Sequence, residues 1–187
     1  MAHPFYTIGH GTRPIGEFID LLCSVEVTLL ADVRTVPRSR TNPQYNQDTL
    51  PRSLDAFGIG YEHMAALGGL RGRAREVALE VNAFWDNDSF HNYADYAMSE
   101  RFRAGLAHLR ALGESQTCAI MCAETVWWRC HRRIITDYLL AAGESVFHIL
   151  GPGHVEEAQM TAAARMQDGG GLIYAAEQPA QRDLFGR

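Results

Sequence analysis

The stretch TCAIMCAETVWWRCHRRIITDYLLAAGESVFHIL, residues 117–150, contains the clearest succession of secondary-structure patterns in the chain. Residues 117–121 form an apolar run of strand length, and residues 145–150 form another. Between them, apolar residues follow helical spacing over 130–142, and Gly143 is a typical helix end. A strand, a helix and a second strand in this order indicate two parallel strands joined by a helical crossover.

The residues before this stretch show the same alternation. Apolar runs of strand length lie at residues 5–8, 28–33 and 59–64. Helical patterns follow them, at residues 15–22, 50–57 and 100–112. We therefore predict an α/β fold over residues 1–150, a single three-layer domain in which helices flank a mostly parallel sheet of about five strands.

The composition changes after Leu150. Residues 151–187 are rich in Gly, Ala and Gln, and residues 169–171 are all glycine. Glycine is unfavourable inside helices. We therefore expect residues 151–187 to form a partly flexible C-terminal tail.

Charge and composition limit the classes of function. The net charge of −5 does not favour nucleic acid over the surface as a whole. All 17 basic residues are arginine, and some of them cluster in a way that suits a local anion site, at positions 34, 38 and 40, at 71, 73 and 75, and at 129, 132 and 133. No apolar run reaches the ~20 residues of a membrane span, and residues 1–7 do not resemble a signal peptide. We expect a soluble, cytoplasmic protein with free thiols and no membrane partner.

Polar side chains stand where the predicted strands end. His10 follows the first strand, Asp32 and Arg34 end the second, and Cys122 and Glu124 follow the fourth. In an open parallel sheet, the ligand crevice lies at the carboxyl ends of the strands. We therefore expect one cleft at this end of the sheet, lined by His10, Arg34, Cys122 and Glu124 together with His131.

The candidate chemistry is concentrated between Cys122 and Arg132. Cys130 and His131 precede Arg132 at the predicted start of a helix, whose free amide groups favour a thiolate. Cys122 is the candidate nucleophile, His131 its acid or base, and Glu124 an orienting group or second proton carrier. Cys130 is the alternative reactive thiol. The structural alternatives are core packing of the cysteines, helix capping by His131, and an ion pair of Glu124 with Arg34 or Arg132.

Arginines from three separate segments are candidates for binding an anion. Arg34, Arg71 and Arg132 would lie on one rim, and arginine holds carboxylate or phosphate through two parallel hydrogen bonds. Tyr96 could stack on a base, although aromatic residues at helical spacing also suit a core. We expect an anionic small molecule or a nucleic acid as partner, bound by His10, Asp32, Arg34, Arg71, Tyr96 and Arg132.

No standard metal or cofactor motif occurs in the sequence. Zinc is an alternative because suitable ligand types are present in Cys122, Glu124, Cys130, His131 and His10. The two cysteines are eight positions apart, however, and Cys130 adjoins His131, which fits no standard zinc spacing. Neither a phosphate-binding loop nor a dinucleotide fingerprint is present. We therefore expect no metal and no cofactor.

Five short blocks occur in order along the chain. They are TIGH at 7–10, DVR at 32–34 with Pro37 and Ser39, LGG at 67–69 with Arg71, YA at 93–94 with Met98, and CAE at 122–124 followed by CHR at 130–132. Together they resemble the family called domain of unknown function 488. The resemblance implies an α/β fold and a pocket lined by these blocks, but no established reaction.

Two features also resemble the rhodanese-type sulfurtransferases. These are the segment Asp32-Val33-Arg34 after a strand, and a cysteine that ends a strand before a helix. The resemblance implies a tight cradle of amides around the cysteine, whereas the bulky residues 125–128 intervene here. Sulfur transfer or redox chemistry is therefore an alternative function.

The final residues, QRDLFGR at 181–187, resemble the peptide by which bacterial replication and repair proteins bind the sliding clamp. Gln181 would make the polar contact, and Leu184 and Phe185 would be the apolar anchors. Arg182 replaces the usual leucine. The alternative is that Leu184 and Phe185 pack on the domain.

The combined interpretation is an enzyme, a thiol-dependent hydrolase or transferase acting on a phosphate- or carboxylate-bearing substrate. A nucleotide or nucleic acid in DNA maintenance or DNA repair would be such a substrate. The alternatives are a non-catalytic binding module that the tail recruits to the sliding clamp, and a rhodanese-like sulfur-transfer or redox protein. The enzyme and the sulfur protein need a reactive thiol, and the binding module does not.

Overall fold

The computed structural model describes residues 3–176. Six strands form one sheet in the order β3-β2-β4-β1-β5-β6, and all neighbours are parallel except β5 and β6. The strands are β1 (Phe5–Gly9), β2 (Leu29–Asp32), β3 (Gly60–His63), β4 (Cys118–Cys122), β5 (Val146–Gly151) and β6 (His154–Glu157). The prediction of an α/β domain with a mostly parallel sheet is confirmed, and an antiparallel sixth strand is added to the five expected.

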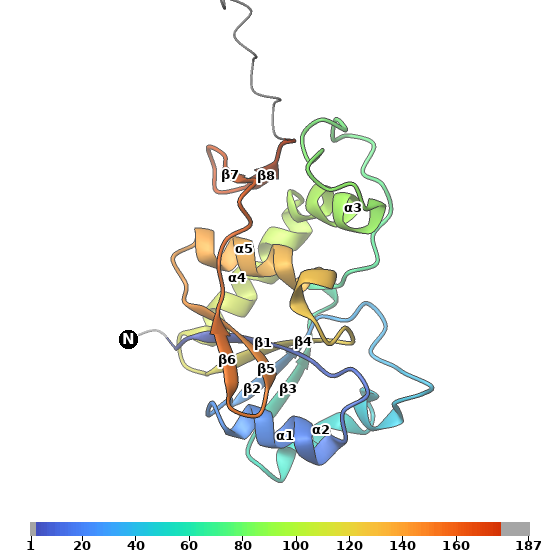
Figure 1. The fold of residues 1–187 in the computed structure, drawn as a ribbon, viewed down its shortest axis with the longest axis vertical. Coiled ribbons are helices and arrows are strands. Elements are labelled where there is room, and N and C mark those ends of the chain that lie inside the picture. Colours follow the sequence, from blue (N-terminus) through green and yellow to red (C-terminus); the bar gives the residue numbers. More distant parts are fainter. Residues whose placement is uncertain (1–2, 177–187) are drawn as a thin grey trace, which may run out of the picture.

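Side chains alternate across the sheet, so each strand contributes to two separate cores. In β4, Ile120 and Cys122 face one core, and Ala119 and Met121 face the other. The first core lies beneath α3 (Asp88–Ala97), α4 (Glu100–Gly113) and α5 (Arg132–Ala141), and the second beneath α1 (Ile15–Cys23) and α2 (Leu50–Asp55) (Figure 1). The side chain of Cys122 therefore lies on the α5 side of the sheet.

The strand order opens a crevice between β1 and β4. The chain leaves β1 for α1 on one face of the sheet, and leaves β4 for α5 on the other face. The carboxyl ends of adjacent parallel strands that diverge in this way are where open α/β sheets bind ligands. Gly9 pairs with Cys122, so the loops after β1 and β4 begin at the same level.

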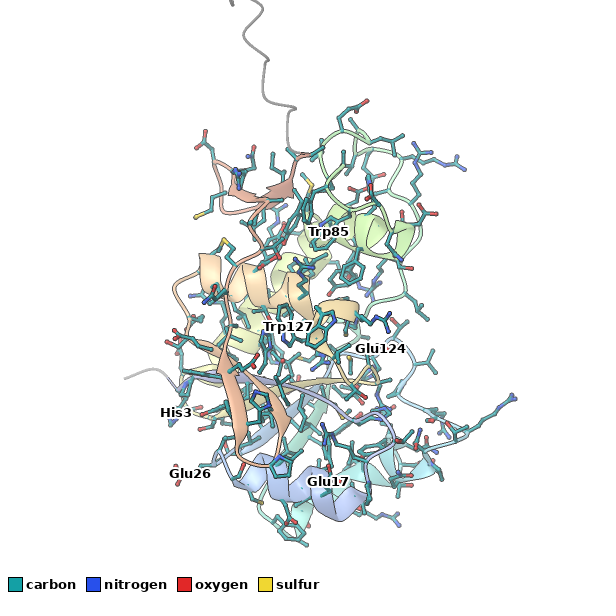
Figure 2. The ribbon with its side chains drawn as sticks, viewed as in Figure 1. His3, Glu17, Glu26, Trp85, Glu124 and Trp127 are labelled. Carbon is teal, nitrogen blue, oxygen red and sulfur yellow. The ribbon has the colours of Figure 1, made fainter. Side chains whose placement is uncertain are left out.

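Helix α5 begins later than the sequence pattern predicts. The pattern predicts a helix over 130–142, but a short 3-10 helix, η3 (Trp127–Arg129), comes first and α5 begins at Arg132. The Trp127 ring, labelled in Figure 2, belongs to the segment that leads into α5. It stacks on the ring of His148 in β5, with 4.3 Å between centroids, and this contact anchors the loop to the sheet. Two further 3-10 helices are η1 (Pro43–Tyr45) and η2 (Ala65–Leu67).

Regular structure continues beyond residue 150. Strand β5 runs to Gly151, β6 pairs with it, and a hairpin follows, made of β7 (Ala164–Met166) and β8 (Leu172–Tyr174). Tyr174 is fully buried in the core beneath α5, and its hydroxyl donates to a carboxylate oxygen of Asp137 at 2.9 Å. A few apolar residues thus anchor a segment whose composition is dominated by small and polar residues.

Two further predictions concern the clamp-binding residues and the membrane. Gln181, Leu184 and Phe185 lie outside the described residues. No helix within residues 3–176 combines the length and the apolar character that a membrane span requires.

Candidate functional site

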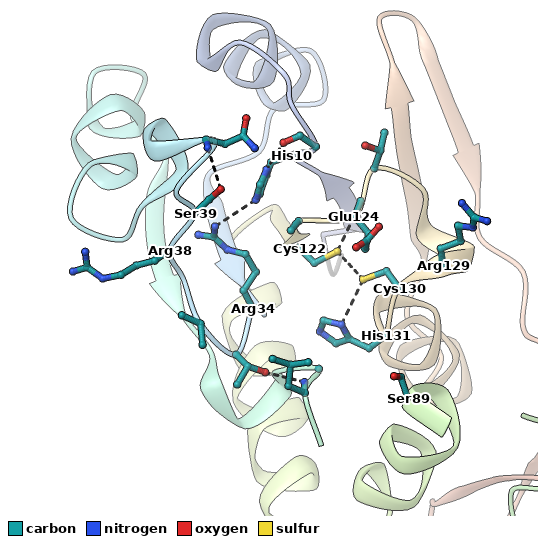
Figure 3. A pocket seen from close by; sticks show the side chains of 18 of the residues that line it. His10, Arg34, Arg38, Ser39, Ser89, Cys122, Glu124, Arg129, Cys130 and His131 are labelled. Atoms are coloured by element: carbon teal, nitrogen blue, oxygen red, sulfur yellow. Dashed lines mark hydrogen bonds between the residues drawn. The ribbon is translucent and has the colours of Figure 1, made fainter. Parts of the chain in front are cut away.

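A cavity of about 680 Å³ opens where β1 and β4 end (Figure 3). This volume is typical of a small-molecule site. The cavity is lined by side chains that the sequence places at strand ends or before α5, namely His10, Arg34, Cys122, Glu124, Cys130 and His131.

Two cysteine sulfurs are in contact inside this cavity. Cys122 is the last residue of β4 and Cys130 precedes α5, and their Sγ atoms are 2.6 Å apart. Both residues are buried, with exposed fractions of 2% and 4%, and both are free thiols. One thiol can therefore donate a hydrogen bond to the other, which favours the thiolate form of the acceptor.

His131 is held by a backbone carbonyl. Its Nε2 atom lies 2.9 Å from the carbonyl oxygen of Val33. A carbonyl oxygen only accepts, so Nε2 is the protonated nitrogen of the neutral ring. The Nδ1 atom lies 3.5 Å from the Sγ of Cys130. It can therefore take the thiol proton of Cys130.

The loop that carries Gly69 lies directly against the His131 ring. A Cβ atom at position 69 would be 2.5 Å from Nδ1 of His131 and 2.9 Å from Cγ and Cε1. Only glycine lets the backbone approach this closely. The Leu67-Gly68-Gly69 block therefore positions the imidazole.

Arg132 is a buried cation next to the sulfur pair. Its exposed fraction is 1%, and its guanidinium donates to the carbonyl oxygen of Glu124 at 2.6 Å and to Oγ1 of Thr7 at 3.5 Å. Its backbone N–H, the first of α5, donates to the Sγ of Cys130 at 3.5 Å. Within residues 3–176 the guanidinium pairs with no carboxylate, and ionisation of Cys122 or Cys130 would place a negative charge beside it.

The two thiols differ in acidity. Burial raises the pKa of Cys122 well above its ordinary value, and the hydrogen bond with Cys130 raises it further. Burial also opposes ionisation of Cys130, but the hydrogen bond from Cys122 and the charges of His131 and Arg132 outweigh burial and hold the pKa of Cys130 well below its ordinary value. Of the pair, Cys130 is therefore the more acidic thiol, and Cys122 is placed to donate a hydrogen bond to it.

His10 and Arg34 form the opposite wall of the cavity (Figure 3). Arg34 binds Asp32 through two hydrogen bonds of 2.9 and 2.6 Å, and its remaining donors contact the carbonyl of Tyr45 and the Nε2 atom of His10. Burial lowers the pKa of His10, whose ring stacks on Tyr45 at 4.2 Å between centroids. This wall is therefore a hydrogen-bonded network in which Asp32 balances the charge of Arg34.

Glu124 does not orient His131. Glu124 is exposed at the cavity, and its carboxylate makes no hydrogen bond to any residue in the described part of the chain. The expected ion pair of Glu124 with Arg34 or Arg132 is likewise not formed, because Arg34 is bound to Asp32 and Arg132 contacts only the backbone carbonyl of Glu124. The carbonyl of Val33 takes the orienting role instead.

The three expected anion-binding arginines do not share one rim. Arg34 lines the cavity, Arg132 is buried beside the thiols, and Arg71 is not among the lining residues. Arg71 lies 3.8 Å from the centre of the Tyr96 ring and donates to the carbonyls of Gly68 and Ala65. Stacking on Arg71 occupies one face of Tyr96, and its hydroxyl donates to Ala66 at 2.7 Å, so both residues support the loop.

Two other arginines line the cavity, Arg38 and Arg129. The sequence signal for them is their place in the arginine clusters, since Arg38 is near Arg34 and Arg129 is near Arg132. Arg38 lies 3.3 Å from an exposed carboxylate of Asp48, and both side chains are exposed, so this pair is weak. Arg38 and Arg129 are therefore better placed than Arg71 to meet an anion.

The zinc alternative requires several ligand side chains that meet at one point. Among residues 3–176, no three or more His, Cys, Asp or Glu side chains gather closely enough to hold a metal ion. The two thiols and His131 stand beside a cation, Arg132, whose positive charge disfavours a bound metal ion.

Comparison with known protein families matches residues 14–139 to the family described as Domain of unknown function DUF488. No curated protein and no solved structure matches the chain significantly. The matched region covers more than half of the chain and includes Arg34, Gly69 and the whole segment from Cys122 to Arg132. The chain therefore belongs to the DUF488 family.

Proposed function

We propose that the protein is a thiol-dependent enzyme, a transferase or a hydrolase, with Cys130 as its nucleophile and a phosphate- or carboxylate-bearing substrate. The observation that carries this proposal is the burial of Arg132 beside the sulfur pair, with no carboxylate partner among the described residues. An unpaired buried guanidinium is strongly unfavourable. A thiolate at Cys130 supplies the missing negative charge, and it makes Cys130, in place of Cys122, the nucleophile.

His131 is the proton carrier in this proposal. Its Nδ1 atom accepts the proton of the Cys130 thiol across 3.5 Å, and the hydrogen bond from Nε2 to Val33 keeps the ring in the required orientation. As an imidazolium, it can return this proton to the leaving group after Cys130 has attacked. A nearby base and a fixed orientation are the usual requirements of an activated cysteine.

The substrate anion would be held by Arg129 and Arg38. Both line the cavity, and Arg129 forms no salt bridge with residues 3–176. Arg34 contributes one donor edge, although Asp32 neutralises its charge. Leu70 and Phe90 also line the cavity and can contact the apolar part of a substrate.

The direct test is a titration of the thiolate by its ultraviolet absorbance. The wild-type protein should show one thiolate with a pKa below the ordinary value of about 8.5. In Cys130→Ser this low-pKa thiolate should be lost, and the remaining Cys122 should ionise only at higher pH, because burial opposes its ionisation more than Arg132 favours it. Cys122→Ser should keep a thiolate, although with a higher pKa because the hydrogen bond from Cys122 is lost. If all four cysteines ionise with ordinary pKa values, the nucleophile hypothesis is refuted and a non-catalytic binding module is favoured.

The link to nucleic acid and DNA maintenance has a separate basis. It rests on the resemblance of Gln181, Leu184 and Phe185 to a clamp-binding peptide. In the proposal, this segment brings the domain to the bacterial sliding clamp, independently of the thiol chemistry. The proposal also includes a cytoplasmic location, because a reducing compartment keeps both thiols available.

A further inference from the structure

We propose that Cys122 and Cys130 act together as a dithiol that reduces small anionic disulfides, with closure of a Cys122–Cys130 disulfide in each reaction cycle. This inference rests on the proposed function, because it uses the same nucleophile and the same cavity. It adds the substrate class and a chemical role for the second thiol.

The placement of the two sulfurs is the first argument. They approach to 2.6 Å from the end of β4 and the start of α5, two elements packed in one core, and both line the cavity. The other two cysteines are apart from this pair, since Cys118 lies in the core without lining the cavity and Cys23 is exposed at the end of α1. A second thiol in contact with the nucleophile can attack a mixed disulfide formed on it. With a disulfide substrate, the same contact completes the reaction.

The first step is attack on the substrate. The Cys130 thiolate attacks one sulfur of R–S–S–R, so a bond forms between Cys130 Sγ and that sulfur, and the substrate S–S bond breaks. The leaving thiolate RS⁻ takes the proton carried by Nδ1 of His131 and departs as RSH. The product is a mixed disulfide between Cys130 and RS.

The second step is resolution by Cys122. Before the first step, burial and the hydrogen bond with Cys130 hold the pKa of Cys122 high, and the negative charge of Cys130 raises it further. Formation of the mixed disulfide removes that negative charge. The positive charge of Arg132 remains, so it now favours the Cys122 thiolate. Cys122 gives up its proton and attacks Cys130 Sγ. The Cys130–SR bond breaks, and RS⁻ takes that proton and leaves as a second RSH.

The overall change is balanced in atoms and electrons. The enzyme dithiol is oxidised by two electrons to a disulfide, and one substrate disulfide is reduced to two thiols. A cellular thiol or dithiol must then reduce the Cys122–Cys130 disulfide to restart the cycle. The anion preference follows from Arg129 and Arg38 in a cavity of small-molecule size.

The test uses oxidised glutathione as an anionic disulfide and hydroxyethyl disulfide as an uncharged one. The reduced full-length protein is mixed with each probe, quenched with acid, digested without reductant and analysed by mass spectrometry. Wild type should yield a Cys122–Cys130 disulfide and two equivalents of released thiol. Cys122→Ser should instead accumulate a mixed disulfide on Cys130, and Cys130→Ser should yield neither product. Cys23→Ser, at an exposed position away from the cavity, is the matched control and should behave as wild type.

The outcomes separate the two proposals. A mixed disulfide on Cys130 that persists equally in wild type and Cys122→Ser would overturn the dithiol inference, while the nucleophile would stand. Failure of Cys130 to react with either probe, together with an ordinary thiolate pKa, would remove both. Equal rates with the two probes would overturn the anionic substrate class. The disulfide is measured by mass spectrometry. A loss of stability in one variant is measured separately, as a change in its melting temperature.

Discussion

The backbone N–H of Arg132 donates to the Sγ of Cys130 at 3.5 Å, while the guanidinium of the same arginine is buried and, within residues 3–176, pairs with no carboxylate. The start of α5 and a buried cation thus act on one sulfur. This relationship makes Cys130 a part of the protein's electrostatic balance as well as its candidate nucleophile.

Replacing Cys130 by Ser should therefore destabilise the fold more than the small change in volume would suggest. The variant leaves Arg132 buried beside Cys122 alone, whose ionisation burial opposes, and we expect the free energy of unfolding at neutral pH to fall by about 2–4 kcal/mol. Urea unfolding measures this change. Cys122→Ser is the matched control and should lose less than half as much. Adding Arg132→Met to Cys130→Ser should recover part of the loss. If the two serine variants are equally stable, Cys130 is not the counter-charge.

Gly69 offers a test of the His131 position. A Cβ at this residue would lie 2.5 Å from Nδ1 of His131, so Gly69→Ala must displace the ring and weaken its contact with Cys130. We expect a loss of about 1–3 kcal/mol in stability and a higher thiolate pKa for Cys130. Thermal unfolding and the ultraviolet titration measure the two effects. Gly72→Ala is the control, because nothing lies within 4 Å of its added Cβ. A Gly69→Ala protein with an unchanged titration curve would show that His131 does not govern the thiolate.

His148 should make the protein less stable in acid. Burial, and then the charge of Arg132, lower the pKa of His148 from 6.5 to about 4. Above the ordinary pKa of 6.5, His148 is unprotonated in both the folded and the unfolded chain. Between the two values, the unfolded chain binds a proton that the folded chain does not, so stability falls as the pH falls, by roughly 3 kcal/mol in total.

The measurement is urea unfolding of wild type and His148→Gln at neutral pH and at about pH 4.5. Glutamine can keep a hydrogen bond to Thr7, which contacts Nδ1 of His148 at 2.7 Å. The wild type should lose more stability on acidification than the variant does. Cys130, whose pKa is held low, also loses its contribution as the pH falls, and the comparison cancels this common part. Parallel losses in the two proteins would contradict the assignment to His148.

The fold and much of the site follow from sequence patterns because they depend on periodicity. Apolar runs place β4 and β5 to within one residue, helical spacing predicts the helix between them, and the rule for parallel sheets brings His10, Arg34 and Cys122 to one crevice. The antiparallel β6 escapes prediction because its residues are all exposed, so its pairing leaves no apolar pattern. The late start of α5 escapes because the stacking of Trp127 on His148 is a contact between distant residues.

The choice between the two cysteines also depends on contacts that sequence does not encode locally. Every residue has a carbonyl, so nothing in the sequence identifies Val33 as the acceptor that fixes the tautomer of His131. An arginine at a helix start is usually expected to face solvent, whereas Arg132 turns into the core. The contact of His131 with Val33 and the burial of Arg132 favour ionisation of Cys130 over that of Cys122. Both features are visible only in the packed structure.

The terminal segment should bind the sliding clamp weakly and separately from the domain. A peptide of residues 176–187 should bind purified bacterial clamp with modest affinity, because a flexible chain loses entropy when it is ordered. Replacing Leu184 and Phe185 by Ala should abolish binding, since each contributes roughly 1.5–3 kcal/mol if fully buried. The same double variant in the full chain should keep its melting temperature and its thiol titration. Absence of binding, or a marked loss of thermal stability on removing the segment, would break the link to DNA maintenance.

Arg129 should set a preference for anions at Cys130. Iodoacetate and iodoacetamide alkylate the same thiolate but differ in charge, so the ratio of their rates at Cys130 reports the local potential and is insensitive to a change in thiolate fraction. We expect Arg129→Gln to lower the iodoacetate-to-iodoacetamide ratio by roughly two- to fivefold at low salt, because one partly screened charge contributes about 0.5–1 kcal/mol. Added salt should shrink the difference. Arg101→Gln, which removes an exposed charge of α4 that does not line the cavity, should leave the ratio unchanged. If both glutamine variants lower the ratio equally, the preference comes from the net charge of the whole protein, and Arg129 holds no anion in the cavity.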